Sequence, residues 1–252
     1  MEDAGGRGHG VGDRLGSDEC LIWRCPVGPV PERLYALLDD AERARALTLG
    51  HEQARARFVT GRVTARLLAA RHAGTAPRDV VFSSTCRHCA GPHGRLEVHT
   101  GAGVLHVSVS HAATRVVVAI ARDTVCGVDI ERVALRGGRI PVSALSPAER
   151  RVLDDLPEQR RLAAFIRYWT RKEAVLKATG DGLVLSPADL TVSAPDAPAS
   201  LLSWANRPPP HVEVHLSDLA VGDGYRGALA TLGRPLTVVE RDVDPREKAS
   251  RL

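Results

Sequence analysis

The segment Trp169-Thr-Arg-Lys-Glu-Ala-Val-Leu-Lys177, which continues to Gly180-Asp-Gly-Leu183, predicts the end of a long helix. Glu173 and Lys177 are four residues apart, so they share one helical face, and Trp169 lies one turn before them. The glycine that opens the second stretch is the residue that commonly ends a helix. By spacing alone, Glu173 and Lys177 form an i,i+4 ion pair worth only about a few tenths of a kcal/mol.

The composition of the whole chain limits what this helix can belong to. Its 252 residues suffice for one large domain or two small ones, and the net charge of +4 suits an anionic partner. No run of about 18 apolar residues suggests a membrane span. Residues 1–17 lack the apolar stretch of a signal peptide and are expected to be a disordered leader. We therefore expect a cytoplasmic monomer whose five cysteines are reduced thiols or metal ligands.

A pass along the chain predicts helices and strands in both halves. We expect a strand at Cys20–Val27, a helix at Glu32–Leu47, a short strand at Asp79–Ser83 and a helix from Glu158 to Thr179. Further strands are expected at Val104–Val109, Val116–Ala121, Val125–Glu131, Leu190–Ser193, Val212–Leu216, Tyr225–Leu232 and Leu236–Val239. The pattern predicts an α+β protein with two facing subdomains, residues 18–122 and 123–245, and a frayed tail at 246–252.

A second long helix, expected over Glu52–His72, has an apolar stripe and a strongly basic opposite face. The basic residues are Arg55, Arg57, Arg62, Arg66 and Arg71. A solvated arginine face is the commoner meaning of this pattern. The functional alternative is a phosphate clamp, because guanidinium groups match phosphate oxygens in shape and charge.

Two acidic residues, Asp129 and Glu131, are two positions apart on one predicted strand, so both side chains point to the same face. Like charges side by side destabilise a sheet unless something compensates for them. A divalent cation such as Mg²⁺ would do so, because it prefers carboxylate oxygens. The alternative is an acidic strand end exposed to solvent.

A loop with Cys86, Cys89 and His93 has the residue types and close spacing of a zinc knuckle. Only three ligands are in hand, and no second Cys/His pair follows downstream. Ordinary thiols in a loop are the preferred interpretation, with bound Zn²⁺ as the alternative.

These features together predict a metal site beside a phosphate site, which is what phosphoryl-group chemistry requires. The metal site would use three carboxylates, Asp129, Glu131 and Glu173. The phosphate site would use Lys177, His111, Arg57, Arg62 and Arg95.

At this point the sequence resembles the larger, single-chain class of 4′-phosphopantetheinyl transferases. The motifs that carry the resemblance are Val107-Ser-Val-Ser-His111, Gly127-Val-Asp-Ile-Glu131 and the opening segment through Leu183. Ser108 departs from the asparagine usual in the family, and Gly94-Arg-Leu96 departs from the usual Gly-Lys-Pro. The resemblance implies two similar α+β subdomains in a pseudo-twofold arrangement. It also implies transfer of phosphopantetheine from coenzyme A to a serine of an apo acyl or peptidyl carrier protein.

The resemblance also implies residue roles. Asp129, Glu131 and Glu173 would hold Mg²⁺, and Glu173 would take the serine proton directly or through a water. Lys177 would stabilise the diphosphate or the leaving group. The coenzyme A phosphates and adenine region would be contacted by Ser110, His111, Arg57, Arg62 and, as further candidates, Arg55 and Arg95.

Two other functions remain open on the sequence. A basic, zinc-bearing nucleic-acid-binding module fits the charge and the cysteine loop, although few aromatics are available for stacking on bases. Another Mg²⁺-dependent phosphotransferase is the second, although no Walker-type glycine loop is present. The type of carrier, from fatty-acid, polyketide or nonribosomal-peptide synthesis, is left open.

Overall fold

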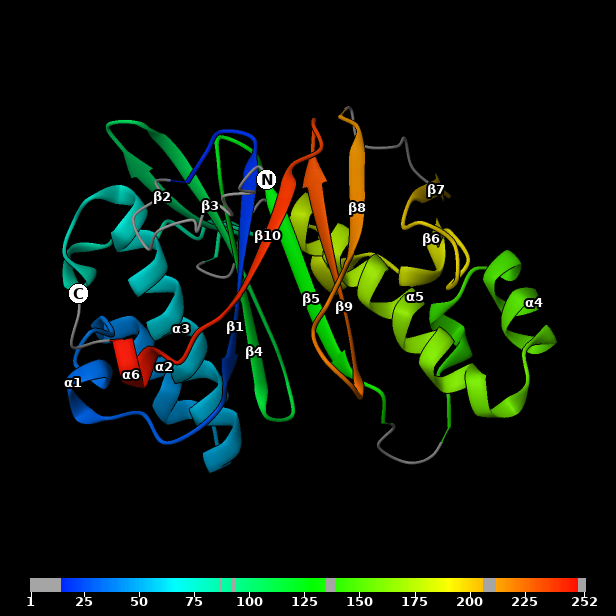
Figure 1. The fold of residues 1–252 in the computed structure, drawn as a ribbon, viewed down its shortest axis with the longest axis horizontal. Helices are drawn as coiled ribbons and strands as arrows, with labels where there is room; N and C mark the ends of the chain where they lie inside the picture. The colour runs from blue at the N-terminus through cyan, green and yellow to red at the C-terminus, as the bar shows by residue number, and fades with distance from the viewer. Residues whose placement is uncertain (1–14, 87, 92–93, 135–138, 206–211, 249–252) are drawn as a thin grey trace, which may run out of the picture.

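The computed structural model describes residues 15–86, 88–91, 94–134, 139–205 and 212–248. Two β-sheets lie face to face at the centre, and a long helix covers the outer side of each (Figure 1). This α/β/β/α layering confirms the α+β class and the two facing halves. Across the described ranges, no helix has the length and apolarity needed to cross a membrane.

The first sheet has five strands in the order β10-β1-β4-β3-β2. Its strands are β1 (Glu19–Pro26), β2 (Leu96–Thr100), β3 (Gly103–Ala112), β4 (Arg115–Arg122) and β10 (Thr237–Asp242). β10 pairs parallel with β1, although it follows the second half in the chain. The predicted boundary therefore needs revision, because residues 237–242 complete the sheet of the first subdomain.

The long helix α3 (Glu52–Ala73) covers the outer face of this sheet, and the shorter helices α1 (Glu32–Tyr35) and α2 (Asp40–Thr48) pack against α3. The single helix predicted at Glu32–Leu47 is wrong, because Asp39 caps α2 by accepting a hydrogen bond from the Glu42 backbone N–H. Arg66 is not a solvated residue of the basic face. It is buried and pairs with Asp39 at 2.6 Å and Glu42 at 2.8 Å.

The second sheet has the order β5-β9-β8 and carries the other long helix, α5. Its strands are β5 (Cys126–Arg132), β8 (Val214–Leu219) and β9 (Tyr225–Leu232). Beyond it lie α4 (Pro147–Asp155), α5 (Glu158–Thr179) and the hairpin of β6 (Leu190–Val192) and β7 (Leu201–Trp204). The predicted limits of α5 are confirmed, and Gly180 ends it in the left-handed conformation, with φ 74°.

Short elements complete the described chain. They are 3₁₀ turns at Pro77–Asp79, Val142–Ala144, Gly182–Val184 and Pro187–Asp189, and the helix α6 (Pro245–Lys248). The strand predicted at Asp79–Ser83 is therefore wrong, since only Ser83 forms an isolated bridge, to Glu97. The tail predicted from residue 246 is helical up to Lys248, and residues 249–252 lie outside the described part, as do residues 1–14 of the predicted leader.

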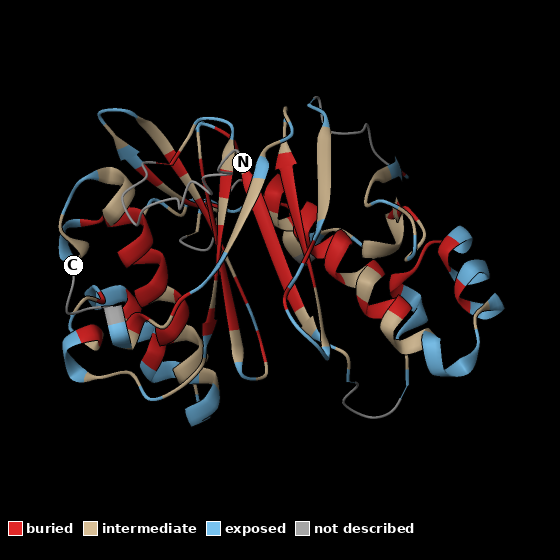
Figure 2. Ribbon diagram, viewed as in Figure 1, coloured by how far each residue is buried: buried red, intermediate tan, exposed pale blue. Residues whose placement is uncertain are grey.

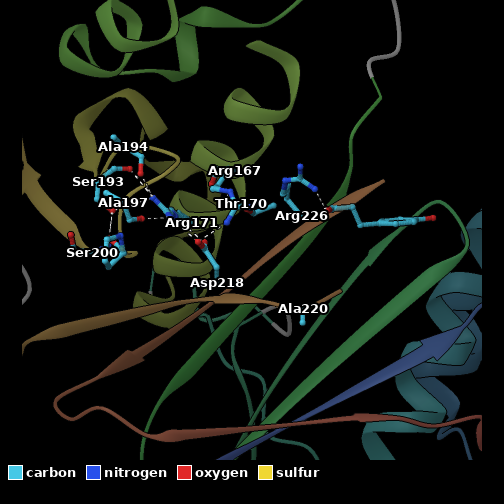
Figure 3. Close-up of polar contacts among 12 residues, drawn as sticks. Arg167, Thr170, Arg171, Ser193, Ala194, Ala197, Ser200, Asp218, Ala220 and Arg226 are labelled. Atoms are coloured by element: carbon cyan, nitrogen blue, oxygen red, sulfur yellow. Dashed lines mark hydrogen bonds and ion pairs between the residues drawn. The ribbon is translucent and has the colours of Figure 1, made fainter. Parts of the chain in front are cut away.

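The guanidinium of Arg171 joins α5 to β8 and to the turn between β6 and β7 (Figure 3). It is fully buried and donates to both carboxylate oxygens of Asp218, at 2.9 and 2.7 Å. It also donates to the carbonyl oxygens of Ser193, Ala194 and Ala197. Together with the Ser193 hydroxyl, six acceptors on β8 and on the turn between β6 and β7 satisfy this one buried cation, so this side chain fixes the outer end of the second half.

The space between the two sheets is apolar and buried (Figure 2). Ile22 and Val117 from the first sheet pack there against Val128 and Ile130 of β5. The intervening β5 residues therefore face the opposite way, toward α5. At Gly127, β5 and α5 approach each other so closely that an added Cβ would lie 2.3 Å from both the Ala174 carbonyl oxygen and the Ala178 nitrogen.

Candidate active site

Asp129 lies at the centre of the site, on the α5-facing side of β5, and only 4% of it is exposed. Its Oδ1 accepts two hydrogen bonds, from Ser110 Oγ at 2.8 Å and from Lys177 Nζ at 2.7 Å. Its other oxygen, Oδ2, is buried and has no hydrogen-bond partner among the described residues. A buried carboxylate oxygen without a donor is costly, so this atom is suited to a ligand.

Glu173 approaches the same region from α5, and its Oε1 is also buried without a described partner. Burial raises the pKa of Glu173, and the negative charge of Asp129 raises it further. Burial and the neighbouring Asp129 raise the pKa of Glu131 from 4.5 to about 7, against the opposing charge of Lys177. The three predicted carboxylates therefore share one electrostatic environment, and each is held partly away from water.

Trp169 supports this group of carboxylates. Its indole lies close enough to Glu131 to lower the pKa of that carboxyl, and its ring stacks on Phe165 with the ring centroids 6.3 Å apart. The sequence places Trp169 only one turn before Glu173 on the same helical face. The contact with Glu131 was missed, because nothing in the local spacing shows which strand the indole meets.

The oxygen ligands that the site offers are compatible with Mg²⁺. Within the described residues, no three Asp, Glu, His or Cys side chains form a ready-made metal cage. Mg²⁺ seldom uses such a cage in proteins: it is usually held by one or two carboxylates, waters and substrate phosphates. The two unpartnered oxygens, Asp129 Oδ2 and Glu173 Oε1, supply that number of ligands. The residues present therefore fit the ion.

Lys177 connects the carboxylates to an adjacent cleft. Its Nζ donates to the Val128 carbonyl oxygen at 3.1 Å as well as to Asp129, and not to Glu173 one turn earlier. The same side chain lines a cleft of about 890 Å³ between α3, β3 and the C-terminal end of α5. This volume lies within the usual range of pockets for small molecules and cofactors.

The cleft gathers most of the predicted phosphate ligands. Those that line it are Arg57, Arg62, Arg95, His111 and Lys177. The guanidinium of Arg62 lies 5.7 Å from the ring centroid of Phe58 and 5.9 Å from that of Phe82. Sequence reasoning missed these two aromatics, although the i,i+4 spacing of Phe58 and Arg62 could have indicated the first. Burial lowers the pKa of Arg62, which shows that this cation is partly withdrawn from water.

Two residues implied by the resemblance lie elsewhere. Ser110 is not among the residues lining the cleft: its hydroxyl contacts Asp129 and accepts the Ile130 N–H at 3.3 Å. Arg55 donates to the carbonyl oxygens of Ala46 and Leu49 at the end of α2, also away from the cleft. Both roles came from the resemblance, which does not show where a side chain of this chain is already hydrogen-bonded.

The cysteine loop borders the cleft. Cys86 lines it, and His88 in the same loop lies 3.0 Å from Asp181, measured from Nε2 to Oδ1. The His88–Asp181 contact, which ties the loop to the turn after α5, was not predicted. His93, the third ligand in the zinc prediction, lies outside the described residues.

Comparisons with known proteins identify the family. Residues 125–230, which include β5, α5 and β9, match the model of the 4′-phosphopantetheinyl transferase superfamily. The chain is 31% identical over 197 residues to the 4′-phosphopantetheinyl transferase HetI of Nostoc sp., covering 73% of this chain and 78% of that protein. It is 30% identical over 166 residues to a putative 4′-phosphopantetheinyl transferase of Synechocystis sp., covering 64% and 65% of the two chains.

Solved structures match a smaller part of the chain. An ACPS–CoA complex from Chronobacterium ammoniagenes is 22% identical, with a TM-score of 0.37, and covers 44% of this chain and 97% of its own. A holo-(acyl-carrier-protein) synthase from Bacillus anthracis with CoA is 26% identical, with a TM-score of 0.34, and covers 43% and 96%. The family match and the relative aligned over most of both sequences lead to one conclusion: this chain belongs to the 4′-phosphopantetheinyl transferases and is an enzyme that transfers 4′-phosphopantetheinyl groups.

Proposed function

We propose that the enzyme transfers 4′-phosphopantetheine from coenzyme A to a serine hydroxyl of an apo acyl or peptidyl carrier protein, in a Mg²⁺-dependent reaction that releases 3′,5′-ADP. One observation carries this proposal. Two buried carboxylate oxygens without described partners, on Asp129 and Glu173, lie beside a lysine that also lines an arginine-bearing cleft. That arrangement offers a cation site next to a phosphate site. Phosphoryl transfer requires both, because the metal neutralises charge on the reacting diphosphate while other cations hold the remaining phosphates.

The cleft is the binding site for the nucleotide part of coenzyme A in this proposal. Arg57, Arg62 and Arg95 supply cations for its phosphates, and His111 lies at the edge of β3. Phe58 and Phe82 flank Arg62 and offer aromatic surface to the adenine ring. Coenzyme A carries several negative charges, so the enclosed arginines both attract it and fix its orientation.

The carboxylates serve the reacting end. Asp129 and Glu173 hold Mg²⁺, with Glu131 as the third carboxylate of the site. Mg²⁺, when bound, neutralises the charge that develops on the diphosphate oxygens. Lys177 lies against Asp129 at the mouth of the cleft and stabilises the leaving 3′,5′-ADP.

Glu173 is the proposed proton acceptor. Burial and Asp129 raise the pKa of its carboxylate, which makes it a stronger base than an exposed glutamate. The serine oxygen bonds to the phosphorus that carries pantetheine, and the serine proton passes to Glu173 directly or through a water. The bond from that phosphorus to the bridging oxygen then breaks, and the electron pair leaves with 3′,5′-ADP.

The direct test is a transfer assay analysed by mass spectrometry. The enzyme is incubated with coenzyme A, Mg²⁺ and apo carrier proteins from fatty-acid, polyketide and nonribosomal-peptide systems. We expect one phosphopantetheine adduct on the carrier, lost with EDTA and absent from a carrier whose acceptor serine is replaced by alanine. Transfer that proceeds unchanged without divalent metal would contradict the metal assignment, and no adduct on any carrier would contradict the proposed acceptor.

A further inference from the structure

Two serines of β3 attach this strand to the neighbouring β5. Ser108 Oγ accepts the Val128 N–H at 3.0 Å, and Ser110 Oγ accepts the Ile130 N–H at 3.3 Å. β5 is the edge strand of its sheet, so these backbone N–H groups have no strand partner on that side. The hydroxyls satisfy them in place of a β-ladder.

Within the described part of the chain, only the Ser110 hydroxyl makes a second contact. Ser110 Oγ also lies 2.8 Å from Asp129 Oδ1, in an environment where both residues are buried. A hydroxyl has one proton and two acceptor positions. Because the Ile130 N–H is itself a donor, the proton of Ser110 is directed to Asp129. The hydrogen bond to a carboxylate is of the stronger, charge-assisted kind.

We propose that Ser110 is a positioning residue that orients Asp129 for the metal, and not a ligand of the coenzyme A phosphates. The inference rests on the proposed Mg²⁺ site. Ser110 and Lys177 both donate to Oδ1, from opposite elements of the fold, β3 and α5. Two fixed donors on one oxygen set the plane of the carboxylate and leave Oδ2 without a donor, beside the equally unpartnered Glu173 Oε1. Groups that orient a metal ligand in this way tune metal affinity without touching the ion.

The hydrogen bonds of Ser110 argue against the phosphate contact that the resemblance implies. His111 and Ser108 line the cleft, whereas Ser110 does not, and the Ser110 hydroxyl is engaged by Asp129 and the Ile130 N–H. A phosphate contact would require the single Ser110 proton, which Asp129 already receives. The carboxylate would then lose one of its two donors.

The chain supplies a matched control for the test. Ser108→Ala removes the same kind of bond to a β5 N–H two residues away, without a contact to Asp129. Because Ser108 lines the cleft, all variants are compared at saturating coenzyme A. Ser110→Ala removes that bond and the Asp129 contact together. Ser110→Thr keeps the hydroxyl and tests whether its loss, and not a general disturbance of β3, causes the effect. Circular dichroism and thermal melting establish that each variant is folded.

The decisive measurement is Mn²⁺ binding, followed by electron paramagnetic resonance on the protein in the presence of coenzyme A and without a carrier. We expect Ser110→Ala to weaken Mn²⁺ binding by about tenfold or more, Ser108→Ala to leave it within about twofold, and Ser110→Thr to restore most of it. In activity assays, Ser110→Ala should raise the half-saturating Mg²⁺ concentration more than the KM for coenzyme A.

The other outcomes test the positioning role of Ser110 separately from the metal site. Equal Mn²⁺ affinity in Ser110→Ala and the unaltered enzyme overturns the positioning role and leaves the proposed metal site intact. An equal loss in Ser108→Ala and Ser110→Ala also overturns it, since both serines would then act only on the strand. A rise in KM for coenzyme A alone assigns Ser110 to the phosphates. No Mn²⁺ binding by the unaltered enzyme removes the metal site itself, and the positioning role with it.

Discussion

Lys177 Nζ lies 2.7 Å from Asp129 Oδ1, so the ammonium group of α5 is paired with β5 and not with Glu173 on its own helix. The i,i+4 pair that spacing alone favours contributes only a few tenths of a kcal/mol, by the usual order of magnitude. Asp129 is almost entirely buried, and a buried carboxylate without donors costs far more than that. The long-range pair therefore prevails, and it leaves the Glu173 carboxylate available to a ligand.

The first prediction concerns that available carboxylate. Glu173→Gln should reduce Mg²⁺-dependent transfer by at least about 100-fold, since a metal ligand and the proton acceptor are lost together. The melting temperature in the absence of metal should stay equal or rise, because the variant removes a carboxylate that is partly withdrawn from water. Burial and the charge of Asp129 already raise the pKa of this group. Steady-state transfer and thermal melting measure the two effects. A variant with near-normal transfer would remove Glu173 from the site.

A second prediction tests the nucleotide cleft. Arg62→Ala should raise the KM for coenzyme A more than the KM for dephospho-coenzyme A, by about tenfold, because a partly buried cation for the 3′-phosphate is lost. Arg55→Ala is the matched control on the same helix, with its guanidinium turned to the carbonyls at the end of α2. Equal effects of Arg62→Ala on both substrates would place Arg62 away from the 3′-phosphate.

The pKa of Glu131 gives a third prediction, for the protein without metal. The folded state raises this pKa from 4.5 to about 7, so between these values the folded state binds more protons than the unfolded chain. The free energy of unfolding therefore loses a contribution as pH rises through this window. Glu131→Gln has no such proton, so its melting temperature relative to the unaltered enzyme should increase from pH 5 to pH 8. Parallel melting curves across this range would contradict the assignment.

Mg²⁺ should reverse this trend. It binds the ionised carboxylates, so the stabilisation that the unaltered enzyme gains from Mg²⁺ should be larger at pH 8 than at pH 5.5. The Glu131→Gln variant should show a smaller dependence on pH. The same melting experiment with and without Mg²⁺ measures both.

The fourth prediction is structural and concerns Gly127. Gly127→Ala places a Cβ 2.3 Å from backbone atoms of α5, so β5 and α5 must move apart. We expect a loss of about 1–3 kcal/mol of stability by urea denaturation and a larger relative loss of transfer, since Asp129 moves with β5. Gly101→Ala is the control, because nothing lies within 4 Å of its added Cβ. Unchanged activity in Gly127→Ala would show that the close approach is not required.

The fifth prediction separates two arginines that share Asp218. Arg171→Ala leaves a partner carboxylate and several carbonyl oxygens without their donor and should cost about 3–5 kcal/mol. Arg167→Ala removes a single, more exposed contact to the same carboxylate and should cost less than about 1 kcal/mol. Urea denaturation measures both. Similar losses would show that burial does not set the value of these pairs.

How much the sequence could predict depended on the range of the interaction. Local rules found α5 within its observed limits. The resemblance to the family was correct, which decides against the nucleic-acid-binding alternative. Local rules failed at Asp39, where a cap divides a run of helix-forming residues, and at Arg66, whose burial depends on partners some 24 to 27 residues away.

The site residues show the same difference between local and long-range interactions. The facing of Asp129 and Glu131 on one strand follows from a period of two, and the cleft does gather the predicted arginines. The engagement of Ser110 by Asp129, and the aromatic neighbours of Arg62, depend on which strands and helices meet across the fold. No spacing within one element contains that information.

The parallel pairing of β10 with β1 has a consequence for how the protein is made. On the ribosome, β1 is synthesised first, and more than two hundred further residues are added before its partner strand β10 is made. Until then one edge of the first sheet offers free backbone groups to any other nascent strand. A chain shortened before Thr237 would keep every residue of the proposed site and leave that edge permanently open, so its defect would be aggregation during expression and not faulty chemistry.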